Sequence, residues 1–190
     1  ILLGHRVSEL PALPDVWSFP GGAISRVDRA VAESHPEWLQ NRDDRVSVFA
    51  LLREMVEELG VVPDGKGGLT EVGEDIRAEV CADKANWRSL MELGALTCQE
   101  FHCEVITDRT TPPQAPARFH NLFFHVALGD SGVEPSFPPG RSEFDEFRWW
   151  RPEEIISSWE RNELYPTTYS HNFQGLGRTN GRNGPGISQC

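Results

Sequence analysis

Long apolar segments, paired cysteines and a surplus of positive charge are all missing from this 190-residue sequence. No stretch approaches the roughly 18 consecutive apolar residues of a membrane span, so we expect no membrane contact. No charged leader followed by an apolar segment opens the chain. The four cysteines form no C-x-x-C pair and are too few for a disulfide scaffold of this length. These absences predict reduced thiols and a cytoplasmic location.

The charge balance restricts the partners. The chain has 18 Lys and Arg against 29 Asp and Glu, a formal net charge of −11. This field repels phosphate polymers at long range, so we expect no nucleic-acid polymer as a partner. A small anionic substrate is compatible with it if metal ions or a few arginines meet the substrate locally. The oligomeric state is left open, with a homodimer as one alternative.

Hydrophobic residues make up 38% of the chain, enough for one globular domain. Alternating or continuous apolar runs predict strands at residues 1–3, 16–19, 96–106, 119–128 and 144–150. Helical periodicity predicts helices over 46–59, over 74–93 as two short pieces, and from Pro152 onward. Strands and helices do not alternate regularly. The order therefore favours an α/β (α+β) fold with a mixed central sheet and helices on both sides.

The helix predicted over 46–59 carries an unusual acidic side. Its apolar residues form one stripe, while Glu54, Glu57 and Glu58 project toward another side at spacings of three and four. Carboxylates this close repel one another, and a divalent cation that prefers oxygen ligands would relieve the repulsion. A solvated acidic face is the alternative. A zinc site on Cys98, His102 and Cys103 is disfavoured, because these residues lack a second pair of ligands.

The segment Arg53-Glu54-Met55-Val56-Glu57-Glu58-Leu59-Gly60-Val61 resembles the second half of the Nudix box, GX5EX7REUXEEXGU, where U is a bulky aliphatic residue. Gly22, in a Phe-Pro-Gly-Gly turn, and Asp28 fit the first half, with Asp in place of the usual Glu. In this sequence 24 residues separate Asp28 from Arg53 instead of seven. The resemblance therefore implies a box split by an insertion, which we place at 29–45.

A split box, together with a partial motif over residues 2–22, is similar to the acyl-coenzyme A diphosphatase branch of the Nudix hydrolases. The resemblance implies a Nudix-like α/β/α sandwich over 1–170, with 74–93 as a helical insertion and 171–190 as an extended tail. It also implies hydrolysis of a nucleoside diphosphate linked to another moiety, with coenzyme A or acyl-coenzyme A as the substrate. The alternatives are ADP-ribose, another nucleotide sugar or a dinucleotide as substrate, or a non-catalytic nucleotide-binding module.

The resemblance also assigns roles to residues. It implies Mg²⁺ or Mn²⁺ held by Glu54, Glu57 and Glu58 and by the backbone of Gly22, with Arg53 as an orienting residue. Glu54 is either a third metal ligand or the general base.

Residues outside the second half of the box complete the expected site. A glutamate near the last strand, Glu143 or Glu146, is an alternative base. The expected contacts to a small-molecule nucleotide substrate come from Arg6, Phe19, Gly22 and Arg118. Whether Asp28 takes the role of the first box acid is left open.

Overall fold

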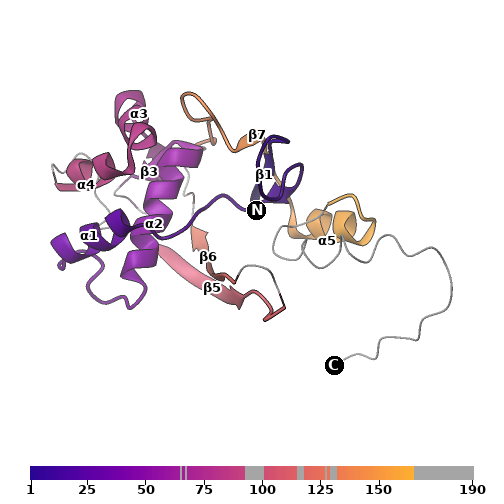
Figure 1. Ribbon diagram of the computed structural model, residues 1–190, viewed down its shortest axis with the longest axis horizontal. Helices are drawn as coiled ribbons and strands as arrows, with labels where there is room; N and C mark the ends of the chain where they lie inside the picture. Colours follow the sequence, from indigo (N-terminus) through magenta and orange to yellow (C-terminus); the bar gives the residue numbers. More distant parts are fainter. Residues whose placement is uncertain are drawn as a thin grey trace.

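The structure is a computed structural model of the whole chain, and it describes residues 1–64, 66, 68–92, 101–114, 118–126, 128 and 132–164. Helices α1 (Arg26–Ser34), α2 (Arg45–Glu54), α3 (Glu74–Ala82) and α4 (Lys84–Glu92) gather on one side of the molecule (Figure 1). Helix α5 (Pro152–Glu160) lies at the other end, beside strands β1 (Leu2–Arg6) and β7 (Phe144–Trp149). None of the described helices combines the length and apolar character needed to cross a bilayer.

One sheet joins the beginning of the chain to its later part. Strands β1 (Leu2–Arg6), β2 (Trp17–Ser18) and β7 (Phe144–Trp149) pair antiparallel in the order β2-β1-β7. A Cβ at Gly4 would overlap the ring of Phe144, so glycine lets that ring pack against the strand. The pairing brings the residues before β7 next to Arg6.

The long helix expected over 46–59 is present, and its character changes along its length. It begins as α2 (Arg45–Glu54) and continues as a π-helical turn, η1 (Met55–Leu59), before Gly60 ends it in the left-handed conformation with φ 70°. The expected apolar stripe is confirmed, because its members lie buried or partly buried in the core. These members are Val48, Leu51, Leu52, Met55, Val56 and Leu59.

Residues 29–45, the proposed insertion in the box, lie mostly at the surface, as their polar composition predicts. Helix α1 (Arg26–Ser34) covers their first part. Val31, Ala32 and Trp38 are buried in the same cluster as α2 and anchor the segment to the body of the protein.

The two short helices expected over 74–93 are confirmed as α3 (Glu74–Ala82) and α4 (Lys84–Glu92). A small antiparallel pair, β3 (Val61–Pro63) and β4 (Leu69–Glu71), precedes them. Trp87 and Leu90 of α4 are buried in the main core. Leu93 lies outside the described residues.

The remaining strands form a hairpin, and helix α5 follows the last strand. Strands β5 (Cys103–Thr110) and β6 (His120–Val126) pair antiparallel, and α5 spans Pro152–Glu160 with the expected proline in its first turn. The three sheets among the described residues are separate and antiparallel, so the expected mixed central sheet is not seen there. Residues 96–100 and the tail at 171–190 lie outside the described residues.

Candidate active site

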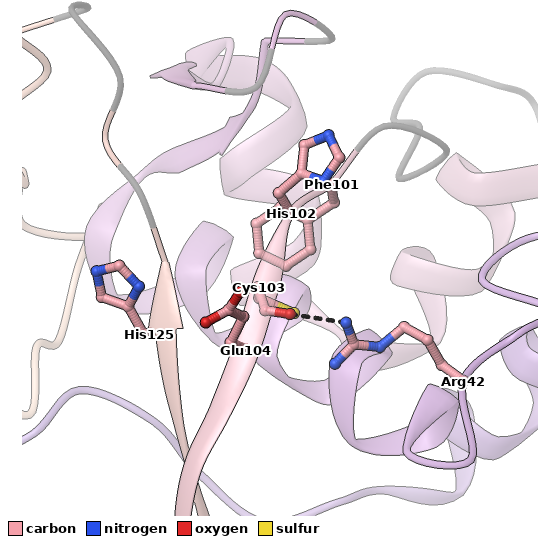
Figure 2. Close-up of a pocket in the computed structure, with 6 residues that line it drawn as sticks. All are labelled: Arg42, Phe101, His102, Cys103, Glu104 and His125. Carbon is pink, nitrogen blue, oxygen red and sulfur yellow. Dashed lines mark hydrogen bonds between the residues drawn. The ribbon is translucent and has the colours of Figure 1, made fainter.

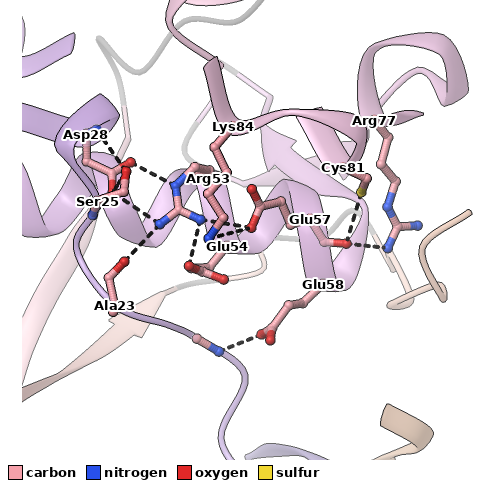
Figure 3. A network of polar contacts seen from close by, with 11 residues as sticks. Ala23, Ser25, Asp28, Arg53, Glu54, Glu57, Glu58, Arg77, Cys81 and Lys84 are labelled. Atoms are coloured by element: carbon pink, nitrogen blue, oxygen red, sulfur yellow. Dashed lines mark hydrogen bonds and ion pairs between the residues drawn. The ribbon is translucent and has the colours of Figure 1, made fainter. Parts of the chain in front are cut away.

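Arg53 is the centre of the polar cluster around the second half of the box (Figure 3). Its side chain is completely buried, and Asp28 receives two of its hydrogen bonds, from Nε at 2.9 Å and Nη2 at 3.1 Å. Nη2 also donates to the carbonyl of Ala23 at 3.1 Å. A buried guanidinium requires charged and hydrogen-bonding partners on every side, and this one has them. Its position ties the glycine turn, α1 and α2 together.

Asp28 is equally buried, and its geometry is set by the start of α1. Its Oδ2 accepts hydrogen bonds from the backbone N–H of Ser25 at 2.7 Å and from the Ser25 hydroxyl at 2.8 Å. These contacts make a capping box, which satisfies free N–H groups at the helix start. Asp28 therefore holds Arg53 from the far side of residues 29–45, which is a positioning role.

Glu54 and Glu57 share one nitrogen of Arg53. Nη1 lies 2.7 Å from Glu54 Oε1 and 2.8 Å from Glu57 Oε2. Burial raises the pKa of Glu57, and although the charge of Arg53 lowers it, burial and repulsion by Glu54 prevail. The other carboxylate oxygen of Glu57, Oε1, is buried without a hydrogen-bond partner among the described residues. That oxygen is an unused anionic ligand.

The pKa of Arg53 is raised as well, and for an arginine this shift favours the charged form. Burial by itself lowers the pKa of the Arg53 guanidinium, but the hydrogen bonds to Asp28 and the charges of Glu54, Asp28 and Glu57 outweigh burial and raise it. Arg53 thus stays charged and neutralises part of a concentrated negative field.

Glu58 turns away from this cluster toward the glycine turn. Its Oε2 accepts a hydrogen bond from the backbone N–H of Gly21 at 2.6 Å (Figure 3). Burial and the nearby charge of Glu54 raise the pKa of Glu58 well above its ordinary value of 4.5, against the lowering effect of the Gly21 N–H. The carboxylate of Glu143 raises it further, and Arg6 lowers it. Glu143 and Arg6 therefore lie close enough to Glu58 to act on its charge.

Gly22 is pressed against Glu54. A Cβ built on Gly22 would overlap the carboxylate of Glu54. The absence of a side chain lets the backbone of the turn approach the acidic helix directly. The sequence places Gly22 at the expected metal site, and the structure brings its backbone beside one of the three glutamates.

The π-helical turn explains why the three glutamates separate. Its wider i→i+5 bonding departs from the α-helical spacing on which their common direction was predicted. Glu54 and Glu57 stay with Arg53, while Glu58 reaches Gly21. Among the described residues, no group of three or more His, Cys, Asp or Glu side chains is arranged tightly enough to hold a metal ion.

The residues nonetheless fit Mg²⁺ or Mn²⁺. Three carboxylates and a glycine backbone offer the hard oxygen ligands that these cations take. The buried Oε1 of Glu57 has no hydrogen-bond partner among the described residues, and a cation would supply one.

Arg77 anchors the π-helical turn, and sequence reasoning missed it. The side chain is 5% exposed and donates from Nη2 to the carbonyls of Glu57 at 3.2 Å and Ser136 at 2.7 Å. Its Nη1 donates to the hydroxyl of Ser136 at 2.8 Å and the carbonyl of Phe137 at 3.0 Å. Burial lowers the pKa of Arg77. The sequence held one indication of this role: Arg77 stands three residues before Val80, on the apolar side of an acidic helix.

The residues expected to contact the substrate differ in whether their side chains are already engaged in other contacts. Arg6 donates to the carbonyls of Leu13 at 3.1 Å and Ala12 at 3.2 Å, and it pairs with Glu143 at 3.1 Å. These bonds occupy its guanidinium, so it organises the loop beside the site. Glu146 is exposed and lies opposite His5 in the β1–β7 pairing.

Two further candidates lie at the surface. Phe19 is 42% exposed and packs edge-to-face on Phe123, with ring centroids 5.4 Å apart. An exposed aromatic ring beside the glycine turn is available to a planar ligand group. Arg118 is exposed in the segment leading into β6.

A cavity of about 440 Å³ lies elsewhere, between the hairpin and the segment before α2 (Figure 2). Arg42 lines it, but its guanidinium is occupied by Asp44 and by the carbonyl of Cys103 at 2.7 Å. His102 and His125 line the same cavity, without a described metal-binding group. Burial raises the pKa of the Cys103 thiol to about 11, so this cysteine stays protonated. The disfavoured zinc site gains no support, and Cys98 lies outside the described residues.

One comparison with known proteins agrees with the resemblance to the Nudix box. No family model matches the sequence, and no curated protein matches it. A crystal structure of a NUDIX hydrolase from Alicyclobacillus acidocaldarius is similar, with a TM-score of 0.69 and 28% sequence identity over 87% of this chain and 77% of that chain. The acyl-coenzyme A branch stays a prediction. The chain therefore has a mixed α/β fold that is Nudix-like over most of its length.

Proposed function

We propose that this protein hydrolyses a nucleoside diphosphate linked to another moiety, using Mg²⁺ or Mn²⁺. The observation that carries the proposal is the cluster of Glu54, Glu57 and Glu58 around Arg53 and the Gly21–Gly22 turn. The likeness to a NUDIX hydrolase supports the same reaction class. Full retention of three carboxylates disfavours a non-catalytic binding module.

The cation would be held by Glu54, Glu57 and Glu58, with the backbone of Gly22. When bound, it neutralises phosphate charge and lowers the pKa of a bound water. Arg53 fixes Glu54 and Glu57 through Nη1, and Asp28 fixes Arg53 in turn. The chain's own work is to hold these oxygens in place, because phosphoryl chemistry depends mainly on positioning and charge.

The general base is proposed to be Glu54 or Glu143. Glu143 is favoured over Glu146 because its charge acts on Glu58 and it pairs with Arg6 beside the site. Glu146 instead lies on the β1–β7 pairing, opposite His5. Glu143→Gln should lower kcat, and Glu146→Gln is the matched control. If both variants keep the kcat of the wild type, Glu54 is the remaining candidate for the base.

Coenzyme A or its thioesters are the proposed substrates, with adenosine 3′,5′-bisphosphate and a phosphopantetheine species as products. The support is the split box and the partial motif over residues 2–22. ADP-ribose and dinucleotides are the competing substrates. The deciding experiment incubates the protein and Mg²⁺ or Mn²⁺ with this panel and identifies the products by mass spectrometry. Activity on ADP-ribose with none on coenzyme A would reject the substrate and keep the chemistry.

Glu57→Gln tests the metal assignment. The change removes one charge with almost no change in shape, and kcat should fall by about 10²-fold or more. A metal titration of the variant should also require a higher concentration of Mn²⁺ for half-maximal rate. Turnover equal to that of the wild type would reject Glu57 as a ligand.

A further inference from the structure

A shallow groove between α1 and α4 carries positive charge on a strongly acidic protein. It has a volume of about 300 Å³ and is lined by Arg26, Val27, Ala30, Ala85 and Arg88. Two guanidinium groups thus border an apolar floor made of one valine and two alanines. The chain as a whole has a net charge of −11, so a local pair of arginines marks a place where an anion is attracted.

The two arginines have unused hydrogen-bonding capacity. Within the described part of the chain, Arg26 makes no hydrogen bond or ion pair, and its side chain is exposed. Arg88 uses Nε to hold Glu92 at 2.7 Å, and its side chain remains 50% exposed. Its two terminal nitrogens have no partner among the described residues. Guanidinium groups with free N–H pairs suit the geometry of phosphate oxygens.

Helix α4 connects the groove to the carboxylate cluster. On the α1 side, Asp28 follows Arg26 by two residues, but Asp28 is buried and holds Arg53, whereas Arg26 is exposed at the groove. On the other wall, Lys84 precedes Arg88 by one helical turn, and its Nζ lies 4.0 Å from Glu57 Oε2. One turn of helix is about 5.4 Å long, so the groove begins about one turn from the proposed diphosphate site. Figure 3 shows Lys84 and Asp28 on either side of Arg53.

We infer that this groove is a second anion subsite, which takes a phosphate monoester on the nucleotide arm of the substrate. The inference rests on the proposed diphosphatase function and adds a substrate class to it. Arg26 and Arg88 bind the phosphate oxygens, and the floor of Val27, Ala30 and Ala85 contacts the carbon atoms of the attached sugar. Substrates with this extra phosphate are therefore preferred over those without it.

Coenzyme A and 3′-dephospho-coenzyme A form the test pair, because they differ by one phosphate monoester. We expect the wild type to have a higher kcat/KM for coenzyme A. The double variant Arg26→Gln/Arg88→Gln should lose about tenfold on coenzyme A, equivalent to about 1.4 kcal/mol, and almost nothing on the dephospho form. The loss should lie in KM, because the subsite contributes equally to ground-state and transition-state binding.

Arg29→Gln is the matched control, because Arg29 is an exposed arginine of the same helix that does not line the groove. It should leave both kcat/KM values unchanged. Thermal unfolding of all variants checks that the fold is intact. Equal losses on the two substrates, or equal effects of Arg29→Gln and the double variant, would overturn the subsite.

A binding measurement separates failure of the subsite from failure of the proposed function. Calorimetric titration with adenosine 3′,5′-bisphosphate and with AMP needs no turnover. We expect about tenfold tighter binding of the bisphosphate in the wild type and equal binding in the double variant. Equal affinity in the wild type, or no binding of either nucleotide, overturns the inference. Tighter binding without hydrolysis of any substrate retains the subsite and rejects the proposed enzyme.

Discussion

At the scale of single residues, the contacts of Arg53 show which parts of the site could be predicted from the sequence and which could not. The box pattern predicted an orienting arginine, and the structure adds that the side chain is wholly buried among Asp28, Glu54 and Glu57. The sequence alone leaves the role of Asp28 open, because an Asp stands there in place of the usual Glu and its alignment with the box is uncertain. Spacing along a chain does not fix a contact across a helical insertion, so only the fold could join Asp28 to Arg53.

Asp28→Asn should destabilise the protein strongly. It leaves the buried guanidinium short of one charge, and breaking a buried ion pair typically lowers the free energy of unfolding by about 3 kcal/mol or more. Urea denaturation measures the change. Glu163→Gln, in an exposed pair with Arg161, is the control and should leave it almost unchanged, because solvent screens an exposed ion pair. Similar values for the two variants would contradict the positioning role of Asp28.

Gly22→Ala should reduce activity much more than stability. The added methyl group would overlap the Glu54 carboxylate and push the turn away from the acidic helix. We expect kcat to fall by about tenfold or more, since small displacements in a site of this kind are expensive. Gly73→Ala is the matched control, because its Cβ would find its nearest neighbour at 3.9 Å. Full activity in Gly22→Ala would show that close approach of the turn is dispensable.

The helix over Arg45–Leu59 shows, at the scale of elements, where prediction from sequence periodicity stops. Apolar periodicity predicted its position and its buried side correctly. The π-helical turn at Met55–Leu59 could not be predicted, because it depends on tertiary contacts made by Arg77 and Gly60. A side chain at Gly60 would overlap both Arg77 and Ser136. The directions of the three glutamates follow from that packing.

Arg77→Met should loosen the π-helical turn. The change removes the hydrogen bonds that Arg77 donates to three carbonyls, those of Glu57, Ser136 and Phe137. The free energy of unfolding should fall by about 2 kcal/mol or more. Hydrogen exchange should rise at the amides of residues 55–60, and kcat should fall with it. Arg29→Met is the control. Unchanged exchange at 55–60 would show that Arg77 does not hold the turn.

At the level of the whole molecule, local sequence patterns predicted the individual helices and strands better than they predicted how the strands pair. The helices over 74–93, the strand at 144–149 and the helix at Pro152 match the structure. The single mixed sheet does not appear in the described parts of the chain, where three short antiparallel sheets occur. Strand pairing depends on partners far apart in the sequence, such as Leu3 and Arg148, and periodicity carries no information about them.

Stability should depend jointly on pH and divalent cation. Burial raises the pKa values of Glu57 and Glu58, so the folded protein favours their protonated forms. Without a cation, the contribution of these two groups to the free energy of unfolding is fully present below pH 4.5, their ordinary pKa. It is lost as the pH rises from there through their raised pKa values.

A cation binds the deprotonated carboxylates. The rise in Tm on adding Mn²⁺ should therefore be small in acid and grow with increasing pH. Thermal unfolding in chelator and in Mn²⁺ across that pH range measures both effects. Glu58→Gln should flatten the pH dependence. The same Tm increment at every pH would contradict a metal site built on these carboxylates.

The burial of Arg53 also has a consequence for the order of folding. Full burial leaves the Nε side of the guanidinium without a charged partner until Asp28 is beside it, so α1 should dock as α2 closes onto the core. Closing the 24-residue segment between the two residues adds only a modest entropic barrier, since that barrier grows with the logarithm of loop length. Docking of α1 should therefore precede or accompany full burial of the Arg53 side chain.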